Sequence, residues 1–284
     1  MGYNRDVIVE CSLTLGRRRT RSESFKKFLF LAKYQEIIME WKKIDSERLF
    51  RSRCVVFDLD GTLCDTEADI VQSLQEALHQ SGLAVADGNA VRIGPPLDTM
   101  IRSAVGENVE PAIIQQIADT FRHIYKRSDF PSSPLYPGAW ELVHQLKAAK
   151  IFLAVATLKR DEPTKRLLEK REILSLFDAT YSCDSGGESW TKERMLQTIM
   201  TAANAAPQEA MFFGDSTVDI LAGRNVGVAT VAALYGYGDK QELFESLPDF
   251  YCENLTDIRL SPENTIPGIR NITVIPLAPG TPQG

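Results

Sequence analysis

The strongest constraint on the fold is an alternation of short apolar runs with stretches of helical periodicity along residues 53–233. The apolar runs are continuous, which is typical of strands buried on both faces of a parallel sheet. Strands are expected at 54–57, 151–156, 177–182, 211–213 and 228–233. Because helical stretches separate these runs, the sequence predicts an α/β fold, a Rossmann-like doubly wound parallel sheet.

Residues 66–131 interrupt this alternation between the first and the second expected strand. Apolar residues recur there at helical spacing, and Gly94-Pro95-Pro96 breaks the pattern. The simplest geometry is a second, smaller all-helical domain inserted into an α/β core, which then comprises 51–65 and 132–260.

The two ends of the chain do not follow the pattern. Residues 1–50 contain a basic cluster at 17–21 and then a loosely amphipathic stretch. We interpret them as a basic arm or amphipathic helix that docks on a partner or membrane surface, or as a variable extension, with Met39 as a possible native start. Residues 261–284 contain five prolines and are expected to form a flexible tail.

Charge and cysteine content exclude several classes of protein. The net charge is −6, made up of +4 over residues 1–50 and −10 over the rest, so the core is not expected to bind nucleic acid. The five cysteines lack the close spacing of a zinc site, which favours a reducing, cytoplasmic compartment. No apolar run reaches about 18 residues, so no membrane span is expected. A monomer or a homodimer is expected.

Three of the apolar runs end in polar residues, which are Asp58, Thr157 and Asp215. In open parallel sheets, ligands bind outside the carboxyl ends of the strands. Loops at that edge can bring Asp58, Asp60 and Asp215 together. Such a cluster repels itself and needs a hard cation, and ligands that are all oxygen favour Mg²⁺ or Ca²⁺ over zinc.

Four segments, in order, resemble the motifs of the haloacid dehalogenase superfamily. Residues 57–63, Phe-Asp-Leu-Asp-Gly-Thr-Leu, are similar to the first motif, DxDGT. Thr157 resembles the second motif, Lys192 at the start of a helix the third, and residues 214–219 the fourth, GDSxxD. The resemblance covers residues 53–250. It extends to the position of the motifs, since the first, second and fourth each follow an expected strand, as in the family.

The resemblance implies a phosphatase that acts through an aspartyl phosphate. Asp58 would be the nucleophile, and Asp60 would be the general acid and then the base for water. Thr157 and Lys192 would bind the phosphoryl oxygens, helped by backbone amides from Asp60 to Thr62. Asp60 also argues against a dehalogenase, because a leaving halide needs no proton.

The resemblance also implies Mg²⁺ as the cofactor. Its ligands would be Asp58, the backbone carbonyl of Asp60, Asp215, and Asp219 directly or through water. Because both the nucleophile and the phosphate are anionic, Mg²⁺ and Lys192 would be needed to bring them into contact.

The inserted helical block, residues 66–131, resembles the helical cap of the family, which implies a site closed to large substrates. The expected substrate is therefore a small phosphorylated metabolite. Residues 93–97 resemble the cap loop of phosphoglycolate phosphatase-like and 5′-nucleotidase-like members, so phosphoglycolate-like compounds and nucleoside monophosphates are favoured. The residues expected to bind substrate are Gly61, Thr62, Leu158, Gly94 and Arg102.

Two departures from the family pattern and two alternative functions remain open. Leu158 stands where many members have Asn, and Glu193-Arg194 follows Lys192 where many members read KPxP. Lys159 and Arg160 are expected to be exposed, with contact to an acidic substrate as the alternative. The alternative functions are a phosphomutase and a catalytically silent binding module of the same fold.

Overall fold

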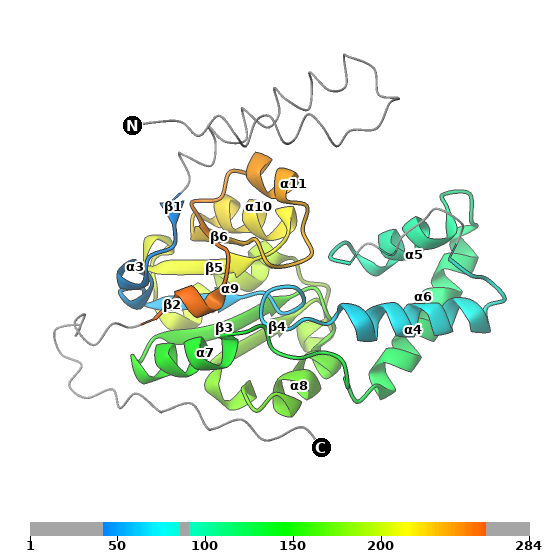
Figure 1. Cartoon of the computed structure of the whole chain (residues 1–284), viewed down its shortest axis with the longest axis horizontal. Coiled ribbons are helices and arrows are strands. Elements are labelled where there is room, and N and C mark those ends of the chain that lie inside the picture. Colours follow the sequence, from blue (N-terminus) through cyan, green and yellow to red (C-terminus); the bar gives the residue numbers. More distant parts are fainter. Residues whose placement is uncertain (1–41, 86–90, 92, 260–284) are drawn as a thin grey trace, which may run out of the picture. The chain divides into compact units, whose positions relative to one another are not determined.

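The computed structural model describes residues 42–85, 91 and 93–259 (Figure 1). The expectations for residues 1–41, including Met39, and for the tail at 261–284 lie outside the described residues. Residues 42–50, which the sequence analysis assigned to the N-terminal extension, contribute one strand and one helix to the core. Their apolar side chains are buried, Leu49 and Phe50 among them.

The sheet has seven strands in the order β1-β7-β6-β5-β2-β3-β4, and every neighbouring pair is parallel. The predicted α/β fold with a Rossmann-like parallel sheet is confirmed. The strands are β1 (Lys42–Lys43), β2 (Cys54–Phe57), β3 (Phe152–Thr157), β4 (Ala179–Ser182), β5 (Ala210–Gly214), β6 (Ala229–Ala233) and β7 (Phe250–Cys252).

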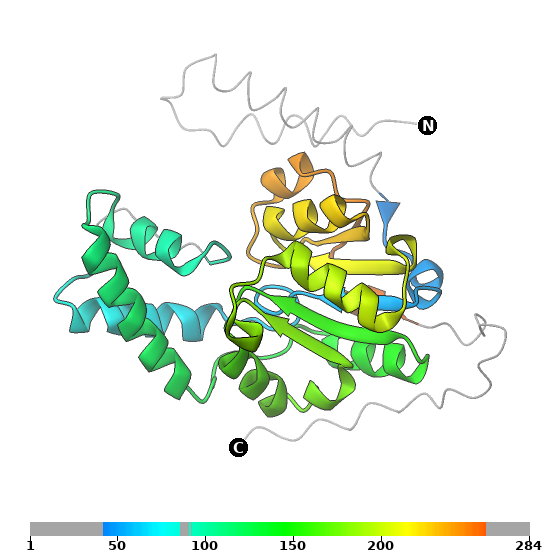
Figure 2. The ribbon, with the colours of Figure 1, turned by 180° about the vertical axis from the view of Figure 1, so that it is seen from behind.

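Helices cover both faces of the sheet (Figures 1 and 2). The α-helices are α3 (Ser46–Phe50), α4 (Glu67–Gln80), α5 (Leu97–Val105), α6 (Pro111–Arg127), α7 (Ala139–Ala148), α8 (Asp161–Lys170), α9 (Lys192–Ala203), α10 (Thr217–Val226) and α11 (Lys240–Glu245). Short 3₁₀ turns occur at Leu174–Leu176, Ser185–Gly187, Pro207–Glu209 and Leu255–Asp257. None of these helices combines the length and the hydrophobicity of a membrane span.

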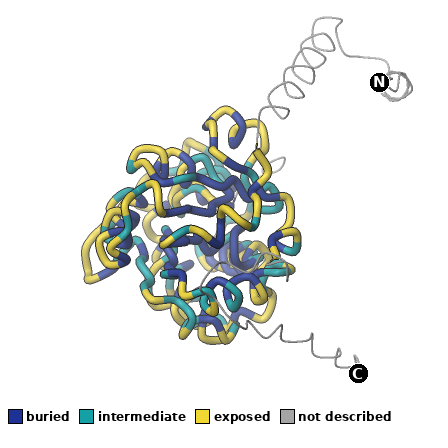
Figure 3. Tube along the Cα trace, turned by 90° about the vertical axis from the view of Figure 1, so that its left-hand side faces the viewer, coloured by how far each residue is buried: buried dark blue, intermediate teal, exposed yellow. Residues whose placement is uncertain are grey.

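The side chains of β2 alternate between two apolar clusters, one on each face of the sheet. Val55 and Phe57 belong to the larger cluster, together with residues of α7, whereas Val56 packs with Phe212 and with Leu196 of α9. The central strands are therefore buried on both sides (Figure 3). This double burial explains why their sequences are continuously apolar.

Helices α4, α5 and α6 lie between β2 and β3 in the chain, and we call them the cap helices. They pack on one another beyond the carboxyl ends of the strands (Figures 1 and 2). Two segments, 58–66 and 128–138, connect them to the sheet, and we call these the cap linkers.

Backbone hydrogen bonds hold the two cap linkers side by side. The Asp65 amide donates to the Pro134 carbonyl at 2.9 Å, and the Tyr136 amide donates to the Leu63 carbonyl at 2.9 Å. The cap helices are thus attached to the core through two linkers that are hydrogen-bonded to each other, not through two separate segments.

Asp69 and Arg171 reinforce this connection from opposite sides. Asp69 of α4 is buried and accepts hydrogen bonds from the Ser132 amide at 3.0 Å and the Ser133 hydroxyl at 2.5 Å. Arg171, which follows α8, donates to the carbonyls of Ser133 and Phe130, both at 2.7 Å. The second cap linker is therefore held by charged groups of both the cap helices and the core.

We expect Asp69→Ala to lower the free energy of unfolding by about 2–3 kcal/mol, because the buried Ser133 hydroxyl and the Ser132 amide both lose a charged acceptor. Urea denaturation of the variant and the wild type measures this difference. Asp119→Ala, on the exposed face of α6, is the control and should leave the midpoint unchanged. An unchanged midpoint for Asp69→Ala would contradict the assigned role.

Candidate active site

Two carboxylates lie side by side because the strands that carry them are paired. Asp58 follows β2 and Asp215 follows β5, and the register places Phe57 opposite Phe213. The Asp58 amide continues the pairing by donating to the Phe213 carbonyl at 2.8 Å. Both carboxylates therefore leave the same edge of the sheet, as the sequence predicted.

A third carboxylate, Asp219, reaches this edge from the first turn of α10. The helix begins with a reciprocal cap, in which Asp219 Oδ2 accepts hydrogen bonds from the Ser216 amide at 3.1 Å and the Ser216 hydroxyl at 2.6 Å. A Cβ atom on Gly214 would lie 2.2 Å from the Asp219 Cβ atom. Only glycine at position 214 lets the helix approach the strand this closely.

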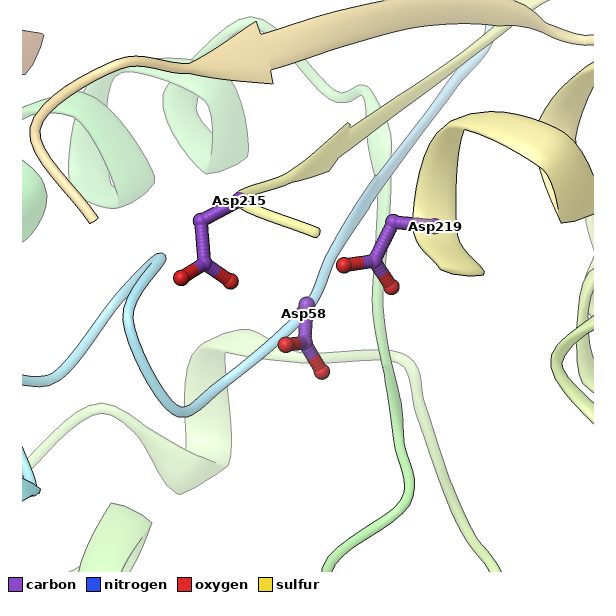
Figure 4. A group of neighbouring side chains, drawn as sticks. All are labelled: Asp58, Asp215 and Asp219. Carbon is purple, nitrogen blue, oxygen red and sulfur yellow. The ribbon is translucent and has the colours of Figure 1, made fainter. Parts of the chain in front are cut away.

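Asp58, Asp215 and Asp219 form a buried carboxylate cluster, each offering an oxygen within 4.8 Å of the others (Figure 4). The pKa of Asp58 is raised to about 7, mainly by burial, which Lys192 opposes and which the neighbouring Asp219 and Asp60 reinforce. Burial, followed by Asp58 and Asp219, also raises the pKa of Asp215 well above its usual range. The cluster is short of positive charge.

Lys192, the first residue of α9, provides positive charge inside the cluster. Its Nζ atom lies 2.5 Å from Asp58 Oδ1 and 2.8 Å from Asp219 Oδ1, and it donates to the Ala156 carbonyl at 2.8 Å. Burial alone would lower the pKa of Lys192, but Asp219 and Asp58 outweigh burial and raise it. Lys192 is therefore held as an ammonium ion.

One ammonium ion does not balance three buried carboxylates. Asp219 Oδ1 lies close to Lys192 Nζ but receives no hydrogen bond of acceptable geometry. The cluster contains only oxygen ligands, is buried, and carries excess negative charge. These properties fit a hard divalent cation such as Mg²⁺, which Asp58, Asp215 and Asp219 would hold.

The loop 235–238 packs against Asp215, and the sequence analysis did not identify it. The Tyr237 amide donates to Asp215 Oδ2 at 2.8 Å. A Cβ atom on Gly236 would lie 2.3 Å from the Asp215 Cβ atom. A Cβ atom on Gly238 would lie 1.7 Å from the carbonyl oxygen of Asp215. The alternation Tyr-Gly-Tyr-Gly directly after a strand was the signal for this close approach.

The hydroxyl group of Tyr237 links the same loop to the first cap linker. It donates to Asp65 Oδ1 at 2.9 Å and accepts hydrogen bonds from the amides of Thr66 and Glu67, where α4 begins. Tyr237 thus contacts both a carboxylate of the cluster and the point where the chain enters the cap helices.

Asp60 lies next to the cluster but has different partners. Its Oδ1 atom accepts hydrogen bonds from the Thr66 hydroxyl and from Lys159 Nζ, both at 2.8 Å. The expectation that Lys159 is exposed is wrong, because its ammonium group is buried between Asp60 and the hydroxyl of Tyr125 on α6. Arg160 is exposed as expected. Metal binding by the Asp60 carbonyl stays a prediction.

Gly61 and Thr62, which were predicted to bind substrate, lie against Asp215. Their amides donate within the loop, to the carbonyls of Cys64 and Leu59, so the predicted contact of these amides with phosphoryl oxygens stays a prediction. A Cβ atom on Gly61 would lie 2.2 Å from Asp215 Oδ2, and the Thr62 hydroxyl lies 3.5 Å from Asp215 Oδ1. Gly61 has a φ of +81°, a backbone conformation that glycine adopts readily and other residues rarely do.

A cavity of about 740 Å³ lies between the carboxylate cluster and the cap helices. Five of the residues predicted to do chemistry line it, and these are Asp58, Asp60, Thr157, Lys192 and Asp215. The predicted substrate contact Leu158 also lines it. Thr157 is buried at the end of β3, and its hydroxyl oxygen accepts a hydrogen bond from the Lys159 amide at 3.2 Å.

The cap side of the cavity differs in part from the expectation. Gly94 lines the cavity, but Arg102 is not among its described lining residues, so the predicted substrate contact of Arg102 is not supported. Arg122 and Lys126 of α6 line it instead. The apolar part of the wall includes Ile93, Leu97, Met100, Phe121 and Trp190.

Comparison with known families agrees with this geometry. Residues 55–233 match the model of the haloacid dehalogenase-like hydrolases. The chain belongs to this family. The haloacid dehalogenase-like match spans the strands that carry Asp58, Thr157 and Asp215, with the cap helices inside it.

Relatives of this haloacid dehalogenase-like chain carry more than one activity in their names. A phosphoglycolate phosphatase of Vibrio parahaemolyticus is 27% identical, over 72% of this chain and 94% of the relative. The tyrosine-protein kinase PtkA of Mycobacterium tuberculosis is 30% identical over 65% of this chain, which spans 62% of that kinase. The structure of a predicted phosphoglycolate phosphatase from Haemophilus somnus is 28% identical, with a TM-score of 0.66 over 73% of this chain and 96% of that protein.

Without Mg²⁺, we expect the stability of this protein to fall as the pH rises from about 4 to about 7. Over this range the folded state holds a proton on Asp58 that the unfolded state has lost, because the folded pKa is about 7. The loss should be on the order of 3 kcal/mol. Thermal denaturation at several pH values measures it, with metal-free Asp58→Asn as the control that lacks this component.

Added Mg²⁺ should then raise the melting temperature more at pH 7.5 than at pH 5, because protons compete for the same carboxylates. If the metal-free wild type and Asp58→Asn have the same stability at every pH, the excess negative charge assigned to the carboxylate cluster is contradicted.

Proposed function

We propose that the chain is a Mg²⁺-dependent phosphatase that hydrolyses small phosphomonoesters through an aspartyl phosphate on Asp58. The observation that carries this proposal is that Asp58, Asp60 and Lys192 line one cavity, and that Asp58 also belongs to the buried carboxylate cluster. The phosphoglycolate phosphatases among the relatives support the same class of reaction.

Asp58 is the nucleophile in this proposal. Lys192 engages Oδ1 of Asp58, so attack on phosphorus is assigned to Oδ2. A bond forms between Oδ2 and phosphorus while the bond from phosphorus to the leaving oxygen breaks. Asp60 gives its proton to that oxygen, and in the second step it takes a proton from the water that attacks the aspartyl phosphate.

Thr157 and Lys192 bind the phosphoryl oxygens. The Thr157 oxygen accepts a hydrogen bond from the Lys159 amide, so its own hydrogen is left to donate toward the cavity. Bound Mg²⁺ would supply the positive charge that lets a phosphate dianion approach the carboxylate cluster. Its ligands would be Asp58, Asp215, Asp219 and the Asp60 carbonyl.

The cavity favours a substrate with both an anionic and an apolar part. Its volume of about 740 Å³ can hold a ligand larger than phosphoglycolate. Arg122 and Lys126 could pair with a second anionic group, and the apolar wall could pack on a nucleobase. Phosphoglycolate-like compounds and nucleoside monophosphates therefore both belong in a first substrate panel.

We also propose a cytoplasmic location and either a monomer or a homodimer. The four cysteines within the described residues are all free, which agrees with a reducing compartment. The acidic charge of residues 51–284 argues against nucleic acid as a partner of the core.

The proposal predicts Mg²⁺-dependent phosphate release from at least one ester of the panel. In Asp58→Asn this release should fall by about three orders of magnitude or more, because the nucleophile is lost. Asp119→Asn, which changes an exposed carboxylate of α6, is the matched control. Transfer of the phosphoryl group without phosphate release would instead indicate a mutase, and Mg²⁺ binding without any turnover would indicate a binding module.

Asp60→Asn should trap the covalent intermediate when the leaving group needs no proton. With para-nitrophenyl phosphate the first step can proceed without an acid, but the second step lacks its base. Intact-mass measurement after quenching should therefore find one added phosphoryl group on Asp60→Asn and none on Asp58→Asn. The absence of that adduct on Asp60→Asn, in a variant that turns over slowly, would contradict the assigned roles.

A further inference from the structure

The buried ammonium group of Lys159 connects the loop that carries Asp60 to the cap helices. Its side chain is 5% exposed. The Nζ atom donates to Asp60 Oδ1 at 2.8 Å and to the Tyr125 hydroxyl at 2.7 Å, and it lies 4.4 Å from the centre of the Tyr125 ring. Lys159 belongs to the core and Tyr125 to α6, so this contact joins the core to the cap helices.

Tyr125 is itself fixed by its neighbours within the cap. Its ring stacks on Phe121 of α6 at 5.3 Å between ring centres and meets the edge of Phe130 at 5.4 Å. These ring contacts hold the Tyr125 side chain in place, so we expect it to move together with α6. Burial raises the pKa of Tyr125 to about 12, so the hydroxyl group keeps its proton.

Two hydrogen bonds that hold Asp60 converge on one of its oxygens. Thr66, just before α4, and Lys159, held by α6, both donate to Asp60 Oδ1. Both of these bonds go to Oδ1, and Asp60 lines the cavity, so Oδ2 is assigned to the proton transfer in the proposed function. Removing either contact would let the carboxylate rotate about its side-chain bonds, and only one of the two depends on the position of α6.

We propose that Lys159 is a positioning residue for phosphoryl transfer, which orients Asp60 toward the leaving oxygen when Tyr125 of the cap lies over the cavity. This inference rests on the proposed function of Asp60. Lys159 then couples the placement of the cap helices to the placement of the general acid, and a cap that is displaced leaves Asp60 poorly oriented.

The first test compares Lys159→Met, which keeps the length of the side chain, with Tyr125→Phe, which removes only the hydroxyl group. Lys165→Met, on the exposed face of α8, is the control. For an alkyl phosphomonoester, kcat should fall about 10- to 100-fold in Lys159→Met and about 3- to 10-fold in Tyr125→Phe, with KM nearly unchanged.

The dependence on the leaving group separates positioning of the acid from general damage. Because para-nitrophenolate needs no proton, the loss of kcat/KM with para-nitrophenyl phosphate should be about tenfold smaller than with the alkyl ester. Equal losses for the two substrates would overturn the proposal. So would a higher KM with unchanged kcat, which would make Lys159 a substrate-binding residue.

A second measurement does not depend on turnover. Amide hydrogen exchange of residues 128–138 should be faster in both Lys159→Met and Tyr125→Phe than in the wild type and Lys165→Met, because the cap is held less tightly. Unchanged exchange in both variants would overturn the coupling between the cap and Asp60. The two proposals can also fail separately. If exchange is faster in both variants but the wild-type protein releases no phosphate from any ester, the coupling between the cap and Asp60 stands and the proposed function is contradicted.

Discussion

The burial of three carboxylates at one edge of the sheet is the constraint on which the rest of the structure depends. Asp58, Asp215 and Asp219 repel one another in a poorly solvated site, and Lys192 offsets only part of their charge. Glycines around the cluster allow its close packing. Gly214 lets α10 approach β5, and the glycines of the loop 235–238 let that loop pack on Asp215. A site under such strain is suited to a divalent cation and an anionic substrate.

The cap helices meet this cluster through Asp60 and through the first cap linker. Thr66 and Lys159 hold the Asp60 carboxylate, and Tyr237 connects Asp215 to the beginning of α4. The same few residues therefore fix both the carboxylates to which we assign catalysis and the attachment of the cap helices. Enclosure of the substrate and orientation of the acid are, in our proposal, parts of one arrangement.

The sequence predicted what depends on local signals. Continuous apolar runs gave the strands, and the polar residues at their ends gave Asp58, Thr157 and Asp215. What it missed depends on contacts between distant segments. Lys159 was expected to be exposed because its partners, Asp60 and Tyr125, lie far from it in the sequence and no local pattern predicts these contacts. Residues 42–50 were placed in the extension because a two-residue strand such as β1 has no detectable periodicity.

A crystal structure of the protein with Mg²⁺ and beryllium fluoride, a mimic of aspartyl phosphate, tests the central claim most directly. The account predicts beryllium bonded to Asp58 Oδ2, with Mg²⁺ bound by Asp58 and Asp215 and the fluoride atoms contacted by Thr157 and Lys192. Beryllium fluoride on another residue, or Mg²⁺ bound away from the three carboxylates, would contradict it.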